Sequence, residues 1–181
     1  SGDIRRVPIP YRKLGDGLMT KPAERLINLS ATDWDSYETS WNFTESPLMK
    51  SEYREGALDT TYKNLSDYHR KVTVEMQELE EEINRTLITA YSLDGELTPE
   101  ISLEQVTLTC NPYYRYGNNK SEKELEALRR TDTMKEFISY AVGCMFGRYS
   151  LDKPGLVLAN QSETLKDYLK RRGIPVPETL N

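Results

Sequence analysis

The chain has 181 residues, of which 37% are hydrophobic and 29% are charged. This length suits one domain, with or without a tail, and the net charge of −5 with a pI near 5.1 argues against a protein that binds nucleic acid over its whole surface. The longest apolar run is too short to span a bilayer, so we expect no contact with a membrane and a cytoplasmic location.

The first residues differ from the rest of the chain. The chain begins with Ser1 and has no initiator methionine, so we expect a piece of a longer protein. Pro8 and Pro10 forbid a central strand, and residues 1–19 are therefore predicted to form an extended arm. Surface solvation explains the basic residues of the arm, and contact with DNA phosphates is the alternative. These basic residues are Arg5, Arg6, Arg12 and Lys13.

A first helix is expected to begin after Thr20, with Leu26, Ile27 and Leu29 facing inward and a new turn or cap near Asp33. Four aromatic residues follow within ten positions: Trp34, Tyr37, Trp41 and Phe43. Acidic rather than basic residues lie between them. This composition favours a small satellite core over a platform that stacks nucleic-acid bases.

The longest periodic pattern lies between Thr61 and Tyr91. Its apolar residues are separated by steps of three and four: Leu65, Tyr68, Val72, Met76, Leu79, Ile83 and Leu87. This spacing predicts one helix that packs along its full length, and about thirty residues would span about 45 Å. The only histidine, His69, lies in this helix without a neighbour at metal-ligand spacing, so we assign it no role.

A motif that suggests catalysis follows a short helix expected at Ser102–Gln105. Asn111–Tyr114 differs by one residue from the Asn-Pro-Pro-Tyr/Phe box of N6-adenine methyltransferases, which binds the flipped target base. Such chemistry also needs a glycine-rich strand–loop–helix that holds S-adenosylmethionine, and the sequence has none. We therefore predict a turn here, and no catalytic, cofactor-binding or metal-binding residue anywhere in the chain.

The densest apolar stretch, Thr133–Tyr149, is predicted to be the core helix. One broad helical face holds Met134, Phe137, Ile138, Ala141, Val142, Met145, Phe146 and Tyr149. Thr133 and Glu136 form a capping-box pair at its start, after a shorter helix over 122–130 that Ser121 and Glu124 cap. In line on one flank are Ser139, Gly143 and Gly147, which predict close packing of another helix. The alternative is a face left open for a partner or for nucleic acid.

The C-terminal part is predicted to hold a last helix, capped by Ser162, with Leu165 inward and Gly173 as its stop. A second candidate DNA-contacting cluster lies on this helix: Lys166, Lys170, Arg171 and Arg172. The two cysteines, Cys110 and Cys144, are expected to be reduced thiols. The fold class is then all-α, a long-helix core with short extended segments, with a helical domain over 20–173 and a tail over 174–181.

Four stretches resemble a known family: GDIRRVPIP, DWDSYETSWNF, ELEEEINRTLITAYSLDGEL and MKEFISYAVGCMFGRYSLDKPGLVLAN. They are similar to the region after the catalytic core in PglX-type adenine-specific DNA methyltransferases of BREX phage-defence systems. Related type IIG restriction–modification enzymes share some of these phrases. The resemblance implies that residues 1–19 close a target-recognition region and that the rest is a helical spacer. The catalytic box and the S-adenosylmethionine site of such an enzyme would lie upstream, in the parent protein.

The resemblance implies a bacterial protein whose isolated chain is not an enzyme and needs no cofactor. Its partners would be DNA through the parent protein, other domains of the same chain and other defence-system subunits. Two alternatives remain open: a free-standing helical module that binds a protein partner, and a module that contacts DNA directly.

Overall fold

Helices form the whole regular structure of the part of the chain that the computed structural model describes, residues 19–177 and 179. Its elements are α2 (Thr20–Trp34), η2 (Pro47–Met49), α3 (Leu58–Tyr91), η3 (Leu103–Gln105), α4 (Pro112–Tyr116), α5 (Glu122–Met145) and α6 (Leu165–Arg171), of which η2 and η3 are 3-10 turns. Within these residues there is no sheet, only one isolated bridge between Ser150 and Lys153. The all-α prediction is confirmed. The predicted arm lies outside the described residues, except for Met19.

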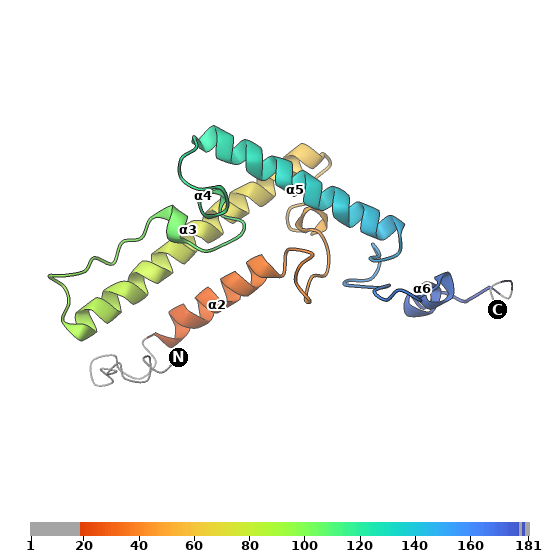
Figure 1. The fold of residues 1–181 in the computed structure, drawn as a ribbon, viewed down its shortest axis with the longest axis horizontal. Helices are drawn as coiled ribbons and strands as arrows, with labels where there is room; N and C mark the ends of the chain where they lie inside the picture. Colours follow the sequence, from red (N-terminus) through yellow and green to blue (C-terminus); the bar gives the residue numbers. More distant parts are fainter. Residues whose placement is uncertain (1–18, 178, 180–181) are drawn as a thin grey trace.

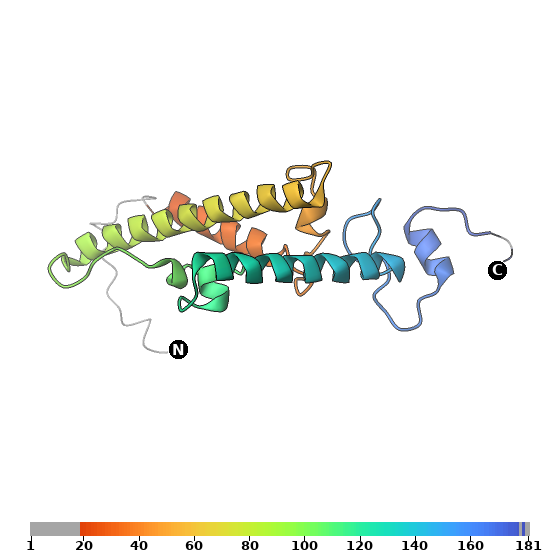
Figure 2. The ribbon, with the colours of Figure 1, turned by 90° about the horizontal axis from the view of Figure 1, so that it is seen from above.

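The long helix α3 is the axis around which the other elements are placed (Figure 1). Its 34 residues span about 50 Å at the helical rise per residue. Helix α2 lies beside it, and α5 crosses it on another side. The turn η3 contacts α3, and α4 contacts both η3 and α5. Viewed from above, α6 lies beyond the end of α5, away from α2 and α3 (Figure 2). None of the helices described here is long and apolar enough to cross a membrane.

The prediction of α3 is confirmed, with a start three residues earlier than expected. Side chains along its second half hold the returning chain in place: Gln77 Nε2 donates to the carbonyl of Ile101 at 2.7 Å, and Asn84 Nδ2 donates to that of Pro99 at 3.2 Å. These bonds satisfy backbone groups that have no helix or sheet partner. The short helix expected at Ser102–Gln105 is the 3-10 turn η3, and Ser102 and Gln105 form a capping box at its start.

The apolar interior is divided into three clusters. In the first, α3 residues pack against α2 and the chain around η3; its buried members are Leu29, Val72, Met76, Val106, Leu108 and Cys110. The second joins η2 to the start of α3 and contains Leu48, Tyr53, Tyr62 and Leu65. The third consists of three aromatic rings, Phe43, Tyr140 and Tyr149, at the C-terminal end of α5. The described chain therefore has no single central core.

Helix α5 differs from its prediction in two respects. Ser121 and Glu124 do form the capping box, but the helix then continues without a break to Met145. The predicted start at Thr133 is wrong, because Thr133 is buried within the helix and its hydroxyl donates to the carbonyl of Arg129 at 2.9 Å. A threonine hydroxyl that donates to the carbonyl four residues earlier makes its hydrogen bond within the helix and does not end it.

The prediction that the apolar stripe of α5 faces the core is wrong for most of the stripe. Ile138, Val142, Met145 and Phe146 are 62%, 43%, 82% and 82% exposed. The face turned to the interior is instead formed by Leu125, Arg129, Thr133 and Tyr140, all buried. The inner face contains a buried arginine and a buried threonine, so it does not coincide with the most apolar stripe. Hydrophobic periodicity alone does not detect such a face.

Three further inward assignments are wrong. Ile27 on α2 is 67% exposed, because α2 packs on one neighbouring helix and presents Leu29 to it. Of the aromatic cluster only Phe43 is fully buried, whereas Trp34 and Trp41 are 55% and 96% exposed.

The C-terminal segment turns back over the end of α5. Gly147 lies outside the helix with φ +78°, and Gly155 bonds to the carbonyl of Thr44, so the segment packs on the loop after α2. The last helix begins at a capping box of Thr164 and Asp167, so the predicted cap at Ser162 is wrong, as is the inward position of Leu165. Gly173, with φ +69°, follows the helix in the left-handed conformation as predicted.

The predicted turn at Asn111–Tyr114 is instead the short helix α4.

Two substitutions on α5 test which face is buried. Leu125→Ala should lower the free energy of unfolding by about 2–5 kcal/mol, since it removes a side chain that is 1% exposed. Phe146→Ala should lower it by less than about 0.5 kcal/mol, the usual limit for surface positions. Urea denaturation measures both values. A larger loss for Phe146→Ala than for Leu125→Ala would show that the apolar stripe is the core after all.

Gly143→Ala tests the packing of Tyr149 against α5. A Cβ atom at position 143 would lie 2.7 Å from the Tyr149 ring, which the third cluster holds in place. We expect a loss of about 1–3 kcal/mol, the usual cost of overpacking. The matched control is Gly95→Ala, where a Cβ meets nothing within 4 Å. In a Tyr149→Ala background the Gly143→Ala penalty should disappear; if the penalty remains there, the ring is not its cause.

Candidate functional site

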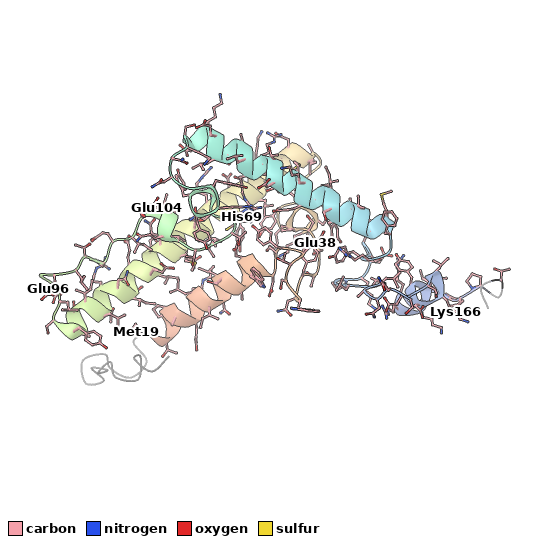
Figure 3. The ribbon with its side chains drawn as sticks, in the orientation of Figure 1. Met19, Glu38, His69, Glu96, Glu104 and Lys166 are labelled. Atoms are coloured by element: carbon pink, nitrogen blue, oxygen red, sulfur yellow. The ribbon has the colours of Figure 1, made fainter. Side chains whose placement is uncertain are left out.

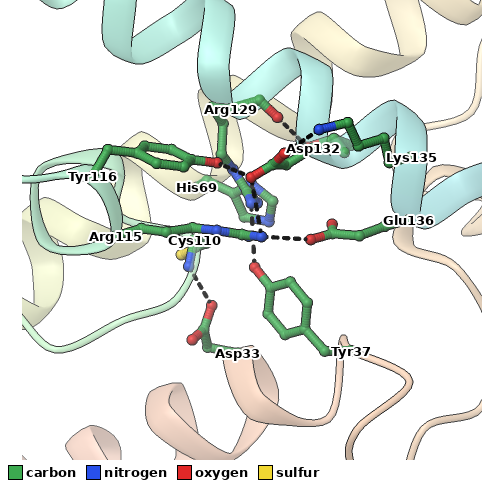
Figure 4. A network of polar contacts seen from close by, with 11 residues as sticks. Asp33, Tyr37, His69, Cys110, Arg115, Tyr116, Arg129, Asp132, Lys135 and Glu136 are labelled. Carbon is green, nitrogen blue, oxygen red and sulfur yellow. Dashed lines mark hydrogen bonds and ion pairs between the residues drawn. The ribbon is translucent and has the colours of Figure 1, made fainter.

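The most unusual polar group in the described chain is the buried guanidinium of Arg129, at the crossing of α3 and α5 (Figure 4). Arg129 is 5% exposed, and its Nη1 and Nη2 atoms contact Tyr37 Oη at 3.3 Å and His69 Nδ1 at 3.1 Å. Both of these partners are uncharged when the phenol and the imidazole are neutral. A cation that is buried without a bonded carboxylate is rare, so this position has a specific role in structure or binding.

Arg129 determines the state of His69. A guanidinium only donates hydrogen bonds, so Nδ1 of His69 must accept one, and the ring proton must then be on Nε2. Burial, followed by the charges of Arg129 and Lys50, lowers the pKa of His69 well below its usual value. The imidazole is therefore neutral, and its one basic nitrogen is already occupied. His69 is thus unsuited to act as a general base.

A second arginine lies next to this pair. Arg115 of α4 donates to Glu136 at 2.9 Å and lies 3.4 Å from Asp132, both on α5. Its guanidinium also stacks on the rings of Tyr37 and Tyr116. Burial and the hydrogen bond to Asp132 raise the pKa of Tyr116 to about 12, so this phenol keeps its proton and donates to Asp132 at 2.9 Å. These contacts join the short helix α4 to α5.

The carboxylate of Asp33, at the end of α2, holds the backbone that leads into α4. It accepts from the backbone N–H groups of Thr109 at 2.6 Å and Cys110 at 2.9 Å. Burial and the nearby Asp33 carboxylate raise the pKa of the Cys110 thiol, so this cysteine stays protonated. Since the thiolate is the reactive form, Cys110 is a packing residue here rather than a nucleophile. Both cysteines are free thiols, as predicted.

Two cavities flank Arg129 and His69, which line both of them. The first, of about 400 Å³, lies between α3, α4 and the first half of α5. The second, of about 340 Å³, lies beside the loop after α2 and is lined by Glu38, Arg115 and Glu136 among others. In Figure 3, Glu38 and His69 lie near the centre of the molecule, where the helices converge. Glu38 Oε1 and Arg115 Nη1 are buried there without a hydrogen-bond partner.

This arrangement can hold α3, α4 and α5 together and can bind a partner molecule. Within residues 19–177 and 179, no group of three or more His, Cys, Asp or Glu side chains is placed to hold a metal ion. S-adenosylmethionine does not fit the described elements either, because such sites are built on a strand, a glycine-rich loop and a helix of a doubly wound sheet. We derive no catalytic step from this region.

The structure gives Asn111 a structural role. Its Nδ2 donates to the carbonyls of Leu103 at 2.6 Å and Val106 at 2.8 Å, and its Oδ1 accepts from the N–H of Tyr113 at 3.1 Å. The residue is fully buried and caps α4. Both polar groups of this side chain bond to the protein's own backbone, whereas the asparagine of a methyltransferase box binds the target base.

Among the other candidate residues that the structure describes, the basic cluster at α6 lies apart from the Arg129 network, whereas Ser139 lines the second cavity. On α6, at the far end of the molecule where Figure 3 labels Lys166, Arg171 and Arg172 form ion pairs with Glu163 and Asp152. Hydrogen bonding by Arg171, and then by the Asn160 backbone, lowers the pKa of Glu163 to about 2. Lys170 is exposed on the same helix. Of the candidate packing face, Ser139 donates to Glu38 at 3.4 Å, while the two glycines contact residues of the C-terminal segment: Tyr149 for Gly143, and Leu158 and Tyr168 for Gly147.

Arg129, Tyr37, Asp33 and His69 were not predicted as a group. The available signal was the 125–129–133–140 series on α5, which has helical spacing but contains an arginine and a threonine. Charged residues at such positions are normally assigned to the solvent face. Only contacts with distant segments show that this face is the inner one.

The pH dependence of stability tests the state of His69. Its pKa in the folded protein is below the value of about 6.5 in the unfolded chain, so the unfolded chain binds the extra proton first. Stability should therefore fall as the pH falls below about 6.5, by up to about 1.4 kcal/mol per pH unit from this residue. His69→Gln keeps an acceptor for Arg129 but does not titrate, so its stability should fall less steeply. Urea denaturation between pH 7.5 and 5 measures both slopes; parallel curves would contradict a neutral His69.

The chain matches no protein-family profile. It is 32% identical over 161 residues to an adenine-specific methyltransferase BrxX of Escherichia coli O9:H4 (strain HS), an alignment that covers 89% of this chain and 13% of the relative. It is also 32% identical over 167 residues to an adenine-specific methyltransferase PglX of Lacticaseibacillus casei (strain Zhang), covering 83% of this chain and 11% of that relative. The chain thus spans only a small part of either relative. Its sequence relates it, along most of its length, to the BREX PglX-type adenine-specific methyltransferases.

Proposed function

We propose that this chain is a non-catalytic helical spacer that supports target recognition in a site-specific N6-adenine DNA methyltransferase of bacterial phage defence. The parent enzyme would use S-adenosylmethionine, act in the cytoplasm and belong to a BREX or a type II restriction–modification system. Its partners would be DNA, the other domains of the same polypeptide and other subunits of the defence system.

The observation that supports this proposal most directly is the pair of alignments. Two methyltransferases from different bacteria each match more than four fifths of the chain but only a small fraction of their own length. A segment of that size cannot account for the whole activity of such an enzyme. A role that assists catalysis and recognition from outside the catalytic centre fits this fraction.

The geometry fits the role of a spacer. A helix of about 50 Å is long enough to separate two domains. It is fixed against α5 by contacts at several points: Arg129 with His69, Arg130 with Asp59 at 2.8 Å, and Tyr62 with Glu126 at 2.8 Å. Contacts distributed along the crossing hold the angle between the two helices, and a fixed angle is what a spacer must provide.

Direct contact with DNA is a weaker candidate for the described residues. Two of the four basic residues proposed for DNA contact in this cluster, Arg171 and Arg172, are already paired with carboxylates. Phosphate binding would have to compete with these ion pairs, although they are partly exposed to solvent and therefore weak. Such binding would show a steep dependence of affinity on salt concentration.

The proposal is tested by measuring cofactor affinity and the methylation rate separately in the full-length methyltransferase. His69→Gln keeps an acceptor for Arg129 but replaces a rigid ring with a more flexible side chain, so it loosens the contact between α3 and α5. We expect unchanged affinity for S-adenosylmethionine by calorimetry, but a methylation rate on target DNA reduced by about tenfold, the order of effect that misplaced recognition elements produce. The control is Glu78→Ala, an exposed change on α3 that should alter neither quantity.

Two results would contradict the proposal. One is a loss of cofactor affinity in the His69→Gln enzyme, which would place this region at the cofactor site. The other is micromolar binding of S-adenosylmethionine by the isolated chain.

A further inference from the structure

One face of α5 is uncovered along the helix. We call it the α5 seam; it consists of Leu128, Thr131, Lys135, Ile138, Val142 and Met145, all exposed. Steps of three and four residues separate its members, and its C-terminal half is entirely apolar, with Phe146 beside it. On the opposite face of the same helix, Leu125 and Tyr140 are buried at 1% and 3% exposure. The second half of α5 is therefore apolar on both sides but covered on one.

An uncovered surface of this kind needs an explanation. Ile138, Met145 and Phe146 are each more than 60% exposed, and they lie on neighbouring turns of one helix. Single exposed apolar residues are common, but a contiguous series with polar residues at its edge marks an interaction surface. A helix that is apolar all round is normally buried all round.

We propose that the α5 seam is the docking surface for an amphipathic α-helix from another region of the same methyltransferase polypeptide. This inference depends on the proposed function, because it requires the chain to be part of a longer enzyme. Alternating steps of three and four residues are the spacing with which one helix packs along another at a small crossing angle. The seam therefore has the spacing that a helix packed along α5 would contact.

The charge on the seam defines the chemistry of that helix. Lys135 lies in the middle of the seam, with its side chain 71% exposed and its ammonium 3.3 Å from Asp132 of its own helix. A docked helix would remove water from this exposed ammonium, and a second carboxylate opposite it would offset that loss better than Asp132 alone. The partner helix should therefore have apolar residues beside Ile138, Val142 and Met145, and an Asp or Glu beside Lys135.

The same lysine argues against a second copy of this chain as the occupant. A parallel pair of copies would bring two Lys135 ammonium groups together, and like charges at such positions destabilise a helix pair. An antiparallel pair centred between Lys135 and Ile138 would press each ammonium against apolar side chains. A helix in the same polypeptide has neither problem and also has a high effective concentration. The relatives contain several times the length of this chain in which such a helix can occur.

Oxidation of methionine by hydrogen peroxide in the full-length methyltransferase tests the seam. Met145 is 82% exposed in this chain, and Met76 is 4% exposed and serves as the buried reference. If the partner helix covers the seam for at least nine tenths of the time, Met145 should react at least about tenfold more slowly than in the urea-unfolded enzyme. Mass spectrometry of the digested protein measures both rates.

Charged substitutions supply the matched comparison. Ile138→Glu with Val142→Glu should displace the helix and restore fast oxidation of Met145, while Met76 stays protected because the interior is intact. Leu97→Glu changes a side chain that is 54% exposed and follows Glu96, which Figure 3 places away from α5, and it should leave Met145 protected.

Fast oxidation of Met145 in the unsubstituted enzyme would overturn the proposal. So would protection that appears only as the enzyme self-associates at rising concentration, since the occupant would then be a second copy. If the enzyme meanwhile methylates target DNA normally and its His69→Gln variant behaves as described, the spacer function stands and only the docking surface is lost.

Discussion

The arrangement of the helices depends on the buried guanidinium of Arg129. It is the point at which three segments far apart in the sequence meet: α5, the middle of α3 through His69, and the loop after α2 through Tyr37. A guanidinium holds its donors in a rigid planar fork, so it fixes directions as well as distances. Removing either acceptor would leave one side of a buried cation unsatisfied, which costs more free energy than the contact itself contributes. The crossing of α3 and α5 is specified by this requirement.

The two faces of α5 follow from the same requirement. The inner face must present Arg129 to its acceptors, and Leu125, Thr133 and Tyr140 share that face because they follow at helical spacing. The more apolar stripe is thereby turned outward. A helix that packs only against its own domain would normally bury the apolar stripe and expose the arginine. The observed orientation makes sense when the surroundings of α5 include more than the described chain.

The sequence predicted well where the structure depends on local spacing. The long helix α3, the capping box at Ser121 and the stop at Gly173 each depend on residues within a few positions of one another. The orientation of α5 and the environment of His69 depend on partners about sixty residues away, and a periodic pattern contains no information about them. The exposed tryptophans are a similar case, because Trp41 would be buried only if another element covered the loop after α2.

The apolar interior is divided among three clusters, and this division determines which parts of the chain can unfold locally. Clusters that share few side chains can lose their packing separately, so local opening reactions need less free energy than global unfolding. Helix α6 has no buried residue, and its amide hydrogens should exchange with solvent through such local openings. The middle of α3, at the junction of the first two clusters, is released only when both are lost. The described chain thus combines a slowly exchanging rod with an end that opens independently, a distribution of stiffness that hydrogen exchange would resolve helix by helix.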